Sequence, residues 1–519
     1  MFLAEPPLNN IVSPGFNLYL FLISIILIIV LIYKMATRCK TCENKLSANK
    51  AGTRSFTQYK NALDSGQHWG KTNLKYYFYS TSDGPVVQDG EGESIRNWTE
   101  TQKNNWRTAI SEWDKHCGLT LTETTDINEQ DIKLYLIDDN SYPYLGHAYF
   151  PGSVFKGQNY CSYNNATDKN FTVGSYDYIT MVHELGHTLG LAHPHDTGGT
   201  STVFPGVSNS ANTGTNQQNQ TAYTVMSYND LNSPITPNNV QSYGFIKGPM
   251  AYDISVIQQL YPGGDSQNTG NSSHILPSNN TTGTVYETIV DSTGTDTIDG
   301  SNAGTNKVFI NMNPHSVDGD SGGRDGWVSK ISGVDGGIVV ANDTTIENAI
   351  AGEGNDKIVG NDADNAIQGG GGNDAFVASN GSDLIYGGNG IDRVYFPGNI
   401  GFYSIIKYGT RRFVIYGIGA YGNIVGKTDV RQMERLQFGR QIYSPIRAFL
   451  VNRRIISRTI RATISPGNKY YLPGNSSDWN IVLLSTGRYF VSGIGFYRII
   501  LPRAIINIQS LTDFVFTAV

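Results

Sequence analysis

A nine-residue repeat constrains the fold of this chain more than any other feature of its sequence. Between residues 350 and 394 a polar residue recurs every nine positions, and an apolar residue follows two positions after each. The polar positions are Asp356, Asn365, Asp374, Asp383 and Asp392, and the apolar ones are Ile358, Ile367, Phe376, Ile385 and Val394. This pattern is typical of a parallel β-roll, in which two repeats make one turn and residues 18 apart stack. We therefore expect such a roll over residues 346–396.

The loops of this roll carry candidate calcium ligands, because Ca²⁺ prefers carboxylate and carbonyl oxygens. One edge would stack Asp356, Asp374 and Asp392, with glycines in the loops at Gly352, Gly354, Gly370, Gly372, Gly388 and Gly390. The other edge would pair Asn365 with Asp383, and its site should be weaker because Asn365 has no charge. Without ions the aligned carboxylates would repel one another, so the roll should need the calcium concentrations found outside cells. The alternative is a repeat array that binds no calcium.

A second motif, HELGHTLGLAH at residues 183–193, predicts a metal centre. On a helix expected over residues 175–189, His183 and His187 lie four positions apart and project from one face. Gly190 allows a sharp helix end, after which His193 supplies a third nitrogen. Three imidazoles with one open position suit a hydrolytic zinc ion, and Glu184 would hold the attacking water. A coincidental or inactive cluster is the alternative. His195, two residues beyond the motif, is expected at the surface.

The region around this motif has mixed helix and strand signals. Thr99 and Gln102 form a capping-box pattern before an amphipathic helix over residues 99–116. Strands are expected at KYYFYS, DIKLYLI and HAYFPG, and a closing helix at residues 248–262 ends at a proline. These patterns predict an α+β catalytic domain over 56–262. An all-β part follows: a β-rich start at 263–345, the repeats at 346–396 and a basic β-rich region at 397–519.

Taken together, these motifs resemble the serralysins, which are metzincin zinc endopeptidases of the repeats-in-toxin class. The resemblance rests on HELGHTLGLAHP, on YTVMSY as a Met-turn, on DISVIQQLY, on TIENAIAGEGNDKIVGN and on the nonapeptide repeats, over roughly residues 60 to 440. It implies that His183, His187 and His193 ligate zinc and that Glu184 is the general base and acid. The sequence PHDTGG after the third histidine and the polar loop to Thr221 depart from the family pattern, which bears on substrate specificity.

The same resemblance implies further roles. Met226 would form an apolar floor under the zinc ligands. Tyr228 would bind zinc as an additional ligand in the empty site and swing away to stabilise the oxyanion. The strand at Ala148, Tyr149 and Phe150 would pair with an extended protein or peptide substrate.

Two functions from different classes follow from these features. The first is a zinc-dependent metalloendopeptidase stabilised by calcium bound to its β-roll. The second is a calcium-dependent surface or adhesion protein whose protease-like domain is an inactive scaffold. The presence of Glu184 and Tyr228 favours the enzyme.

The N-terminal region predicts a membrane anchor at residues 17–34, between a tail at 1–16 and a stalk at 35–55. Leu18 to Tyr33 is a charge-free run of 16 residues that would span about 24 Å as a helix. Basic residues follow the run, and the positive-inside bias then places the rest of the chain in the cytoplasm. The calcium requirement argues for the exported side, so we expect an extracellular protease domain, either anchored or secreted.

Charge and cysteine content add two further expectations. Residues 397–519 carry 16 Lys and Arg against four acidic residues, so this region is near +12 and the rest of the chain near −18. The basic region could bind an anionic partner, or its arginines could lie on the solvent faces of strands; no specific nucleic acid is predicted. Cys117 and Cys161 could form a disulfide in an exported domain or remain buried thiols.

Overall fold

The computed structural model describes residues 57–84, 86–88, 91–230, 242–263, 270–291, 293–317, 326–418, 421–422 and 424–452, and short strands beyond residue 469. The expected anchor at 17–34 and its flanking tail and stalk lie outside these residues. Within the described part of the chain, no helix has the length and apolar character needed to span a bilayer.

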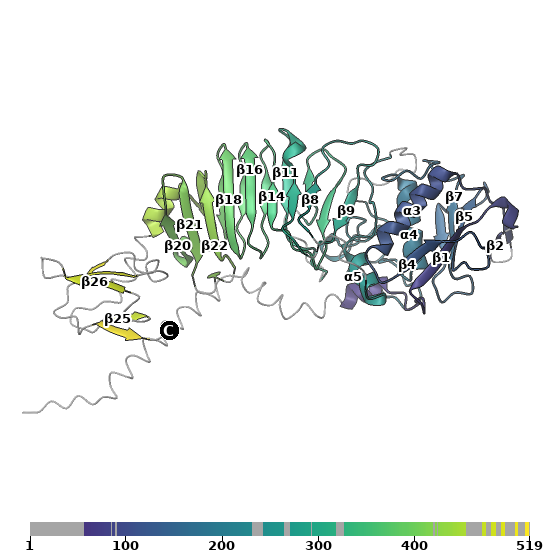
Figure 1. The fold of residues 1–519 in the computed structure, drawn as a ribbon, viewed down its shortest axis with the longest axis horizontal. Coiled ribbons are helices and arrows are strands. Elements are labelled where there is room, and N and C mark those ends of the chain that lie inside the picture. Colours follow the sequence, from purple (N-terminus) through teal and green to yellow (C-terminus); the bar gives the residue numbers. More distant parts are fainter. Residues whose placement is uncertain are drawn as a thin grey trace, which may run out of the picture. The chain divides into compact units, whose positions relative to one another are not determined.

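The N-terminal half of the described chain is an α+β domain built on a five-stranded sheet, in the order β4-β1-β5-β7-β6. Its strands are β1 (Asn73–Phe78), β4 (Thr120–Glu123), β5 (Ile132–Ile137), β6 (Gly146–Ala148) and β7 (Gln158–Ser162). Four strands run parallel, while β6 pairs antiparallel with β7 and forms one edge. Helices α3 (Glu100–Asp114) and α4 (Tyr176–Thr188) pack against the sheet (Figure 1). Strands β2 (Val86–Gln88) and β3 (Glu91–Glu93) form a hairpin between β1 and α3 in the sequence.

Helix α3 begins where its capping box predicts. The Thr99 hydroxyl accepts a hydrogen bond from the Gln102 backbone N–H, and the Gln102 side chain accepts one from the Thr99 backbone. Trp106 and Trp113 are fully buried on one face of this helix. The Trp113 indole donates to the Val182 carbonyl at 3.1 Å, which fixes α3 against α4. The sequence therefore places the helix that supports the histidine helix.

The second half of the described chain is a parallel β-roll made of two facing sheets. Strands of every second nine-residue repeat pair with each other at an 18-residue offset, for example Lys357 with Ala375 and Ala366 with Leu384. The apolar residues of all five repeats are at most 1% exposed, so they fill the space between the sheets. One sheet has the order β20-β21-β22-β18-β16-β14-β10-β8 and the other β12-β11-β15-β17-β19-β23-β24, so the roll extends beyond residues 346–396 on both sides (Figure 1).

The strands of the first sheet are β8 (Ser273–Ile275), β10 (Thr297–Asp299), β14 (Asn348–Ile350), β16 (Ala366–Gly371), β18 (Ser382–Asn389), β20 (Tyr403–Lys407), β21 (Arg412–Gly417) and β22 (Lys427–Arg431). The second sheet contains β11 (Val308–Asn311), β12 (Lys330–Ile331), β15 (Lys357–Val359), β17 (Ala375–Val377), β19 (Arg393–Phe396), β23 (Arg435–Phe438) and β24 (Gln441–Tyr443). The C-terminal strands are β25 (Tyr470–Pro473), β26 (Trp479–Leu483), β27 (Tyr489–Gly493), β28 (Ala504–Ile506) and β29 (Phe514–Thr517).

The hydrophobic core of the α+β domain continues into the residues that begin the second half. Helix α5 (Ala251–Leu260) closes the α+β domain, and strands β9 (Tyr286–Ile289) and β13 (Gly337–Val340) follow and pair with each other. Trp327 and other residues between 286 and 339 belong to the same buried cluster as α3 and α4. His315 is completely buried among the rings of Tyr223, Tyr252 and Trp327. The domain boundary expected after residue 262 therefore follows the end of helix α5, but the buried cluster continues across it.

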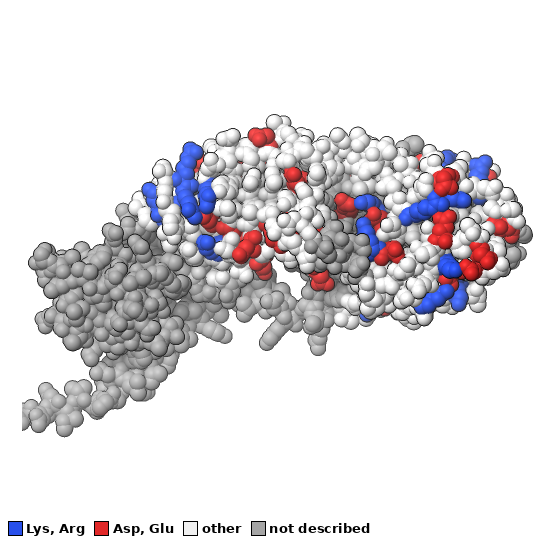
Figure 2. Space-filling view, viewed as in Figure 1, with Lys and Arg blue, Asp and Glu red and all other residues white. Residues whose placement is uncertain are grey.

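Basic side chains gather over β20 to β22 at one end of the roll (Figure 2). Arg412 and Arg431 both form ion pairs with Asp429, and their guanidinium groups lie over the rings of Tyr408 and Tyr386. These two arginines therefore hold neighbouring strands together. The anionic partner stays a prediction, and much of the basic sequence lies outside the described residues.

Cys117 and Cys161 are both buried free thiols. The structure therefore shows buried thiols at these positions and no disulfide between them. Burial raises the pKa of the Cys117 thiol to about 11. Neither sulfur is poised for chemistry at neutral pH.

Candidate metal centre and substrate cleft

Helix α4 presents two histidines from one face. Ser175 caps the helix by accepting a hydrogen bond from the Tyr178 backbone, and Asp177 lies in the first turn, where a negative charge is favourable. His183 and His187 are each 7% exposed and their ring centroids are 4.8 Å apart. The four-residue spacing therefore brings both imidazoles to the same point, as the sequence predicts.

Gly190 turns the chain so that the third histidine joins them. Its φ of +106° is a conformation that residues with a side chain rarely adopt. A Cβ at this position would also lie 2.5 Å from the Gln67 carbonyl oxygen. After the turn, the Nε2 atom of His193 lies 3.1 Å from Nε2 of His183 and 3.0 Å from Nε2 of His187.

The other ring nitrogen of each histidine is held by a hydrogen-bond partner. His183 Nδ1 lies 2.8 Å from the Val225 carbonyl, and His187 Nδ1 lies 2.7 Å from the Leu191 carbonyl. His193 Nδ1 lies 2.9 Å from the Asp196 carboxylate. Because carbonyls and carboxylates accept hydrogen bonds, each Nδ1 carries the proton, and the three Nε2 atoms turn lone pairs toward one point.

This arrangement fits a tetrahedral zinc ion. Zn–N bonds of about 2.05 Å at tetrahedral angles would separate the nitrogens by about 3.3 Å, close to the observed spacing. Burial lowers the pKa of His183 to about 3, and it also lowers the pKa of His187. Both rings are therefore neutral at physiological pH, which is the form that binds a metal. Three converging lone pairs without a proton between them repel one another unless a cation lies at their centre.

The Met-turn lies beneath this centre and is pinned by α5. Met226 is fully buried, and a Cβ on Gly186 of α4 would lie 2.6 Å from its sulfur. The buried Asp253 carboxylate accepts hydrogen bonds from the Thr224 hydroxyl at 2.6 Å and from the Val225 N–H at 2.7 Å. Asp253 thus fixes the Val225 carbonyl that orients His183. A lone acidic residue in a closing helix gives no sequence signal for this function.

Glu184 lies next to the first ligand, in a buried position on the wall of the cleft. Burial raises the pKa of its carboxyl group to about 8. Gly146 of the edge strand approaches closely, since a Cβ there would lie 2.7 Å from Cγ of Glu184. The carboxyl group is therefore held between helix α4 and the edge strand, facing the cleft.

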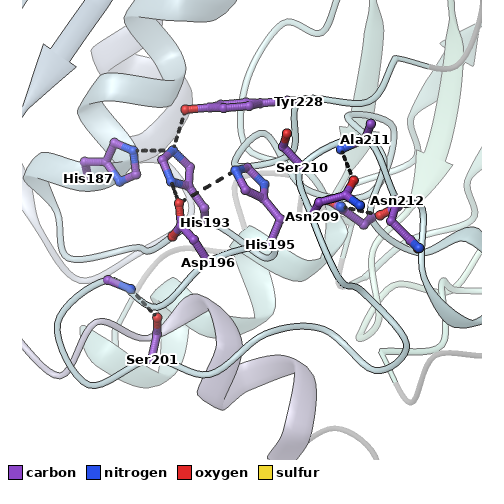
Figure 3. Close-up of polar contacts among 12 residues, drawn as sticks. His187, His193, His195, Asp196, Ser201, Asn209, Ser210, Ala211, Asn212 and Tyr228 are labelled. Carbon is purple, nitrogen blue, oxygen red and sulfur yellow. Dashed lines mark hydrogen bonds and ion pairs between the residues drawn. The ribbon is translucent and has the colours of Figure 1, made fainter.

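The Tyr228 hydroxyl completes the rim of the metal centre (Figure 3). It lies 2.9 Å from Nε2 of His193, which is the atom that faces the other two imidazoles. The residue is 53% exposed, and burial of its hydroxyl raises the pKa of the phenol. The phenol therefore stays protonated and can donate a hydrogen bond.

Two neighbours of His193 carry functions that sequence reasoning missed. Asp196, in the segment PHDTGG, orients His193, so that departure from the family pattern supplies a carboxylate partner for the third ligand. His195 was expected at the surface, but its side chain is only 6% exposed. Its ring stacks on the His193 ring with 4.7 Å between the ring centroids, and its centroid lies 4.5 Å from that of the Tyr228 ring (Figure 3). The expectation was wrong because the turn after Gly190 folds both histidines inward.

The expected substrate strand is shorter than its sequence suggested. Strand β6 ends at Ala148, whereas Tyr149 and Phe150 follow it, and Tyr149 N–H still donates to the Gln158 carbonyl at 3.1 Å. The Phe150 ring lies against His187. Strand β7 pairs with one side of β6, and no strand of the described residues pairs with its other side, which lies beside Glu184.

A cleft of about 740 Å³ opens between this edge, α4 and the segment after the Met-turn. Its walls include Leu145 and Gly146 from the edge region, Ile179, His183 and Glu184 from α4, and Val225, Tyr228 and Asp230 from the Met-turn region. Ser210, Ala211 and Thr213 of the polar loop complete it.

The loops of the β-roll form a ladder of carboxylates along one edge. Asp374 Oδ1 accepts from the Asp356 backbone N–H, and Asp392 Oδ1 accepts from that of Asp374, both at 2.9 Å. Glu434 Oε2 continues the series by accepting from the Asp392 N–H at 3.0 Å. Among the described residues, Oδ2 of Asp374 and Oδ2 of Asp392 are buried without a hydrogen-bond partner. Burial raises the pKa of Asp374 to about 7, so this edge has the donor set for a cation.

The glycines of these loops allow the turns to stack. Gly390 has a φ of +135°, and a Cβ there would overlap the Gly372 carbonyl oxygen. The Gly352, Gly354, Gly370 and Gly388 positions lie in the same stacked loops.

At the opposite edge, where the sequence predicts a weaker calcium site, the Asn365 side chain has several hydrogen-bond partners. The Asn365 amide donates to Asn361 Oδ1 at 2.8 Å and to the carbonyls of Ile346 and Glu347 at 3.3 and 3.4 Å. Its own oxygen accepts from the Asn361 N–H at 3.0 Å. The Asn365 amide N–H groups therefore bond to oxygens at this edge. The pKa of Asp383 there is raised to about 7, chiefly by burial, and the charges of Asp362 and Asp364 add to the shift.

One further acidic cluster, near β10, was missed. The Asp291 side chain is fully buried, and within the described chain neither of its oxygens has a hydrogen-bond partner. His274 Nε2 lies 3.4 Å away, and Asp296 N–H donates to Glu347 nearby. These residues lie outside the regular repeat, so the nine-residue period could not reveal them.

Comparison with known protein families matches two regions of the chain. The family described as Matrixin matches residues 68–223, and the family described as Peptidase M10 serralysin C terminal matches residues 264–391. The chain is similar to serralysins from Photorhabdus laumondii subsp. laumondii (31% identical, 57% of this chain and 60% of that protein) and Proteus mirabilis (32%, 56% and 60%). It is also similar to the metallopeptidase AprA of Pseudomonas marginalis (29%, 58% and 62%). The matched part spans about three fifths of the length of these relatives.

Proposed function

We propose that this chain is a serralysin-like metzincin, a zinc-dependent metalloendopeptidase that hydrolyses peptide bonds of proteins. The observation that carries the proposal is that Nε2 of His193 lies within 3.1 Å of Nε2 of both His183 and His187, beside a buried carboxyl group that faces a cleft.

In this proposal His183, His187 and His193 hold the ion. Zinc, when bound, supplies a Lewis acid that polarises the scissile carbonyl and lowers the pKa of water. Glu184 accepts the proton of the attacking water and later donates it to the leaving amine. A pKa near neutrality suits both steps, and burial moves the pKa of Glu184 in that direction.

Tyr228 stabilises the charge that develops on the carbonyl oxygen. Its hydroxyl lies at the rim of the metal centre, and its raised pKa keeps the proton available for donation. In the resting site the same hydroxyl is close enough to His193 to serve as an additional ligand. Met226 supports the centre from below.

An extended peptide would add to the free edge of β6, at Gly146 to Ala148. Backbone hydrogen bonds along a sheet edge position a substrate without requiring a particular sequence. Gly146 then places the scissile bond next to Glu184, because its missing side chain lets the two elements approach.

Several calcium ions in the roll would stabilise the enzyme, with the edge of Asp356, Asp374 and Asp392 as the main site. This dependence places the protease on the exported side of a membrane, either anchored through residues 17–34 or secreted. Proteolysis of intact membranes or vesicles with an external protease tests the topology, because the domain must be accessible from outside.

Hydrolysis of casein separates the enzyme from an inactive adhesion scaffold. We expect casein cleavage that 1,10-phenanthroline abolishes and that Glu184→Ala lowers by about 10³-fold or more. Glu129→Ala is the matched control, because that glutamate forms only an exposed ion pair with Lys75. If the wild-type chain and the control cleave casein only at the same background rate as Glu184→Ala, the enzyme is excluded and the scaffold function stands.

A further inference from the structure

We propose that Asp230 makes the cleft beside Glu184 selective for a basic substrate side chain, lysine or arginine, adjacent to the cleaved bond. The inference rests on the proposed peptidase function and adds a substrate class to it.

Asp230 follows the Met-turn and lines the cleft. Its Oδ1 atom accepts a hydrogen bond from the Thr221 hydroxyl at 2.9 Å. Its Oδ2 atom is buried and has no hydrogen-bond partner among the described residues. A buried carboxylate oxygen without a donor is costly, so a ligand that brings a donor to this point is favoured.

The carboxylate is held in place by the polar loop. Thr221 N–H donates to the Asn229 carbonyl at 2.7 Å, and the Asn229 amide donates to the Ser210 and Asn219 carbonyls at 2.7 and 3.0 Å. These bonds fix residues 229 and 230 against the loop, whose Ser210 lies beside Tyr228 (Figure 3). The orientation of Asp230 toward the cleft is therefore built into the fold.

Asp230 has no basic partner in the described lining of the cleft. That lining contains the carboxyl groups of Glu184 and Asp230 and no lysine or arginine. An acidic substrate side chain would be repelled, and an apolar one would leave Oδ2 of Asp230 without a donor.

Part of the wall between these carboxyl groups is apolar. Leu145, Ile179 and Val225 supply aliphatic surface, and Tyr144 and Tyr176 supply rings. A lysine or arginine has the matching form, an aliphatic stem with a charged tip. The stem would lie along these walls while the tip reaches Asp230.

Matched peptides that differ by one ammonium group test this proposal. In each peptide one of the four positions nearest the scissile bond holds lysine or norleucine, which has the same stem without the charge. At one position we expect lysine to raise kcat/KM by about 10- to 100-fold, as a charge-assisted hydrogen bond would. Asp230→Asn should bring that ratio close to one, while Asp126→Asn, an exposed carboxylate outside the cleft, should keep it.

Binding gives the same comparison without turnover. The affinity of Glu184→Gln for the two peptides, measured by fluorescence anisotropy, should also favour lysine and lose that preference when Asp230→Asn is added. Cleavage of both peptides at equal rates at every position, or a lysine preference that survives Asp230→Asn, would overturn the subsite and leave the peptidase function intact. Tighter lysine binding without any hydrolysis would support the subsite and contradict the peptidase function.

Discussion

The metal centre and the β-roll loops hold their candidate ligands in opposite ways. In the metal centre, the second nitrogen of each histidine has a partner within 2.9 Å, so the ligands are oriented by the protein itself. In the roll, Asp374 and Asp392 each bury an oxygen that has no hydrogen-bond partner in the described chain. The first site is prepared by the fold, whereas the second is stable only when something else satisfies its oxygens.

This difference predicts which ion the fold needs. Zinc would enter a site whose geometry already exists, so its removal should abolish activity and leave the structure in place. Calcium would neutralise buried carboxylates, so its removal should destabilise the roll itself.

Calcium withdrawal should have the largest effect on stability. At a calcium concentration about 1,000-fold above its dissociation constant, binding contributes about 4 kcal/mol to the free energy of unfolding, which EGTA would remove. Circular dichroism during heating should show a large fall in Tm with EGTA and a small one with 1,10-phenanthroline. Equal shifts in Tm with the two chelators would contradict the proposed difference between the two sites.

Tyr228→Phe should lower activity without disturbing the metal centre. Loss of one hydrogen-bond donor to a developing oxyanion typically costs about 10- to 100-fold or more in kcat. Zinc content and Tm should stay unchanged, because the three histidines keep their own partners. Tyr408→Phe, an exposed tyrosine of the roll, is the control, and a loss of zinc in Tyr228→Phe would assign the tyrosine a structural role instead.

The pH dependence of the calcium-free chain should sharpen the comparison further. Burial raises the pKa values of Asp374 and Asp383 in the folded chain to about 7, above the unfolded value near 4. The folded state therefore binds more protons than the unfolded state between these pH values. The stability that these two groups contribute is fully present below pH 4 and is lost as the pH rises through 7. In EGTA the unfolding free energy should be higher at pH 5 than at pH 8 by on the order of 1 kcal/mol or more, or roughly 2–4 °C in Tm.

Saturating calcium should remove most of this dependence, because the bound ion replaces the protons. A calcium-free Tm that rises steadily from pH 5 to pH 8 would show that these carboxyl groups are not destabilising.

Asn365→Asp should have the smallest effect. The change removes amide donors to Asn361 and to two backbone carbonyls, and should cost about 1 kcal/mol in EGTA. Calcium should offset that cost by binding the new carboxylate. Asn373→Asp keeps the oxygen that accepts from the Ile391 N–H and serves as the control. If Asn365→Asp changes nothing in either condition, the amide network does not stabilise this edge.

The sequence predicts most of the two sites because their spacing is local. The four-residue interval between His183 and His187 and the nine-residue repeat each follow from the geometry of one helix or one strand pair. Partners that arrive from elsewhere in the chain leave no such signal. Asp253 contacts the Met-turn from α5. Asp230 becomes a candidate site residue only through its hydrogen bond with Thr221 and its place in the cleft. Asn365 fits the repeat by position, but its amide hydrogen bonds depend on Asn361 and on the preceding turn.

Elemental analysis of the purified, calcium-saturated protein tests the central claim most directly. Wild-type protein reconstituted with zinc should hold one zinc ion per chain, and His187→Ala should hold none while keeping its folded spectrum. A folded wild-type chain without stoichiometric zinc after reconstitution, or a His187→Ala chain that retains it, would contradict a metal centre at these three histidines.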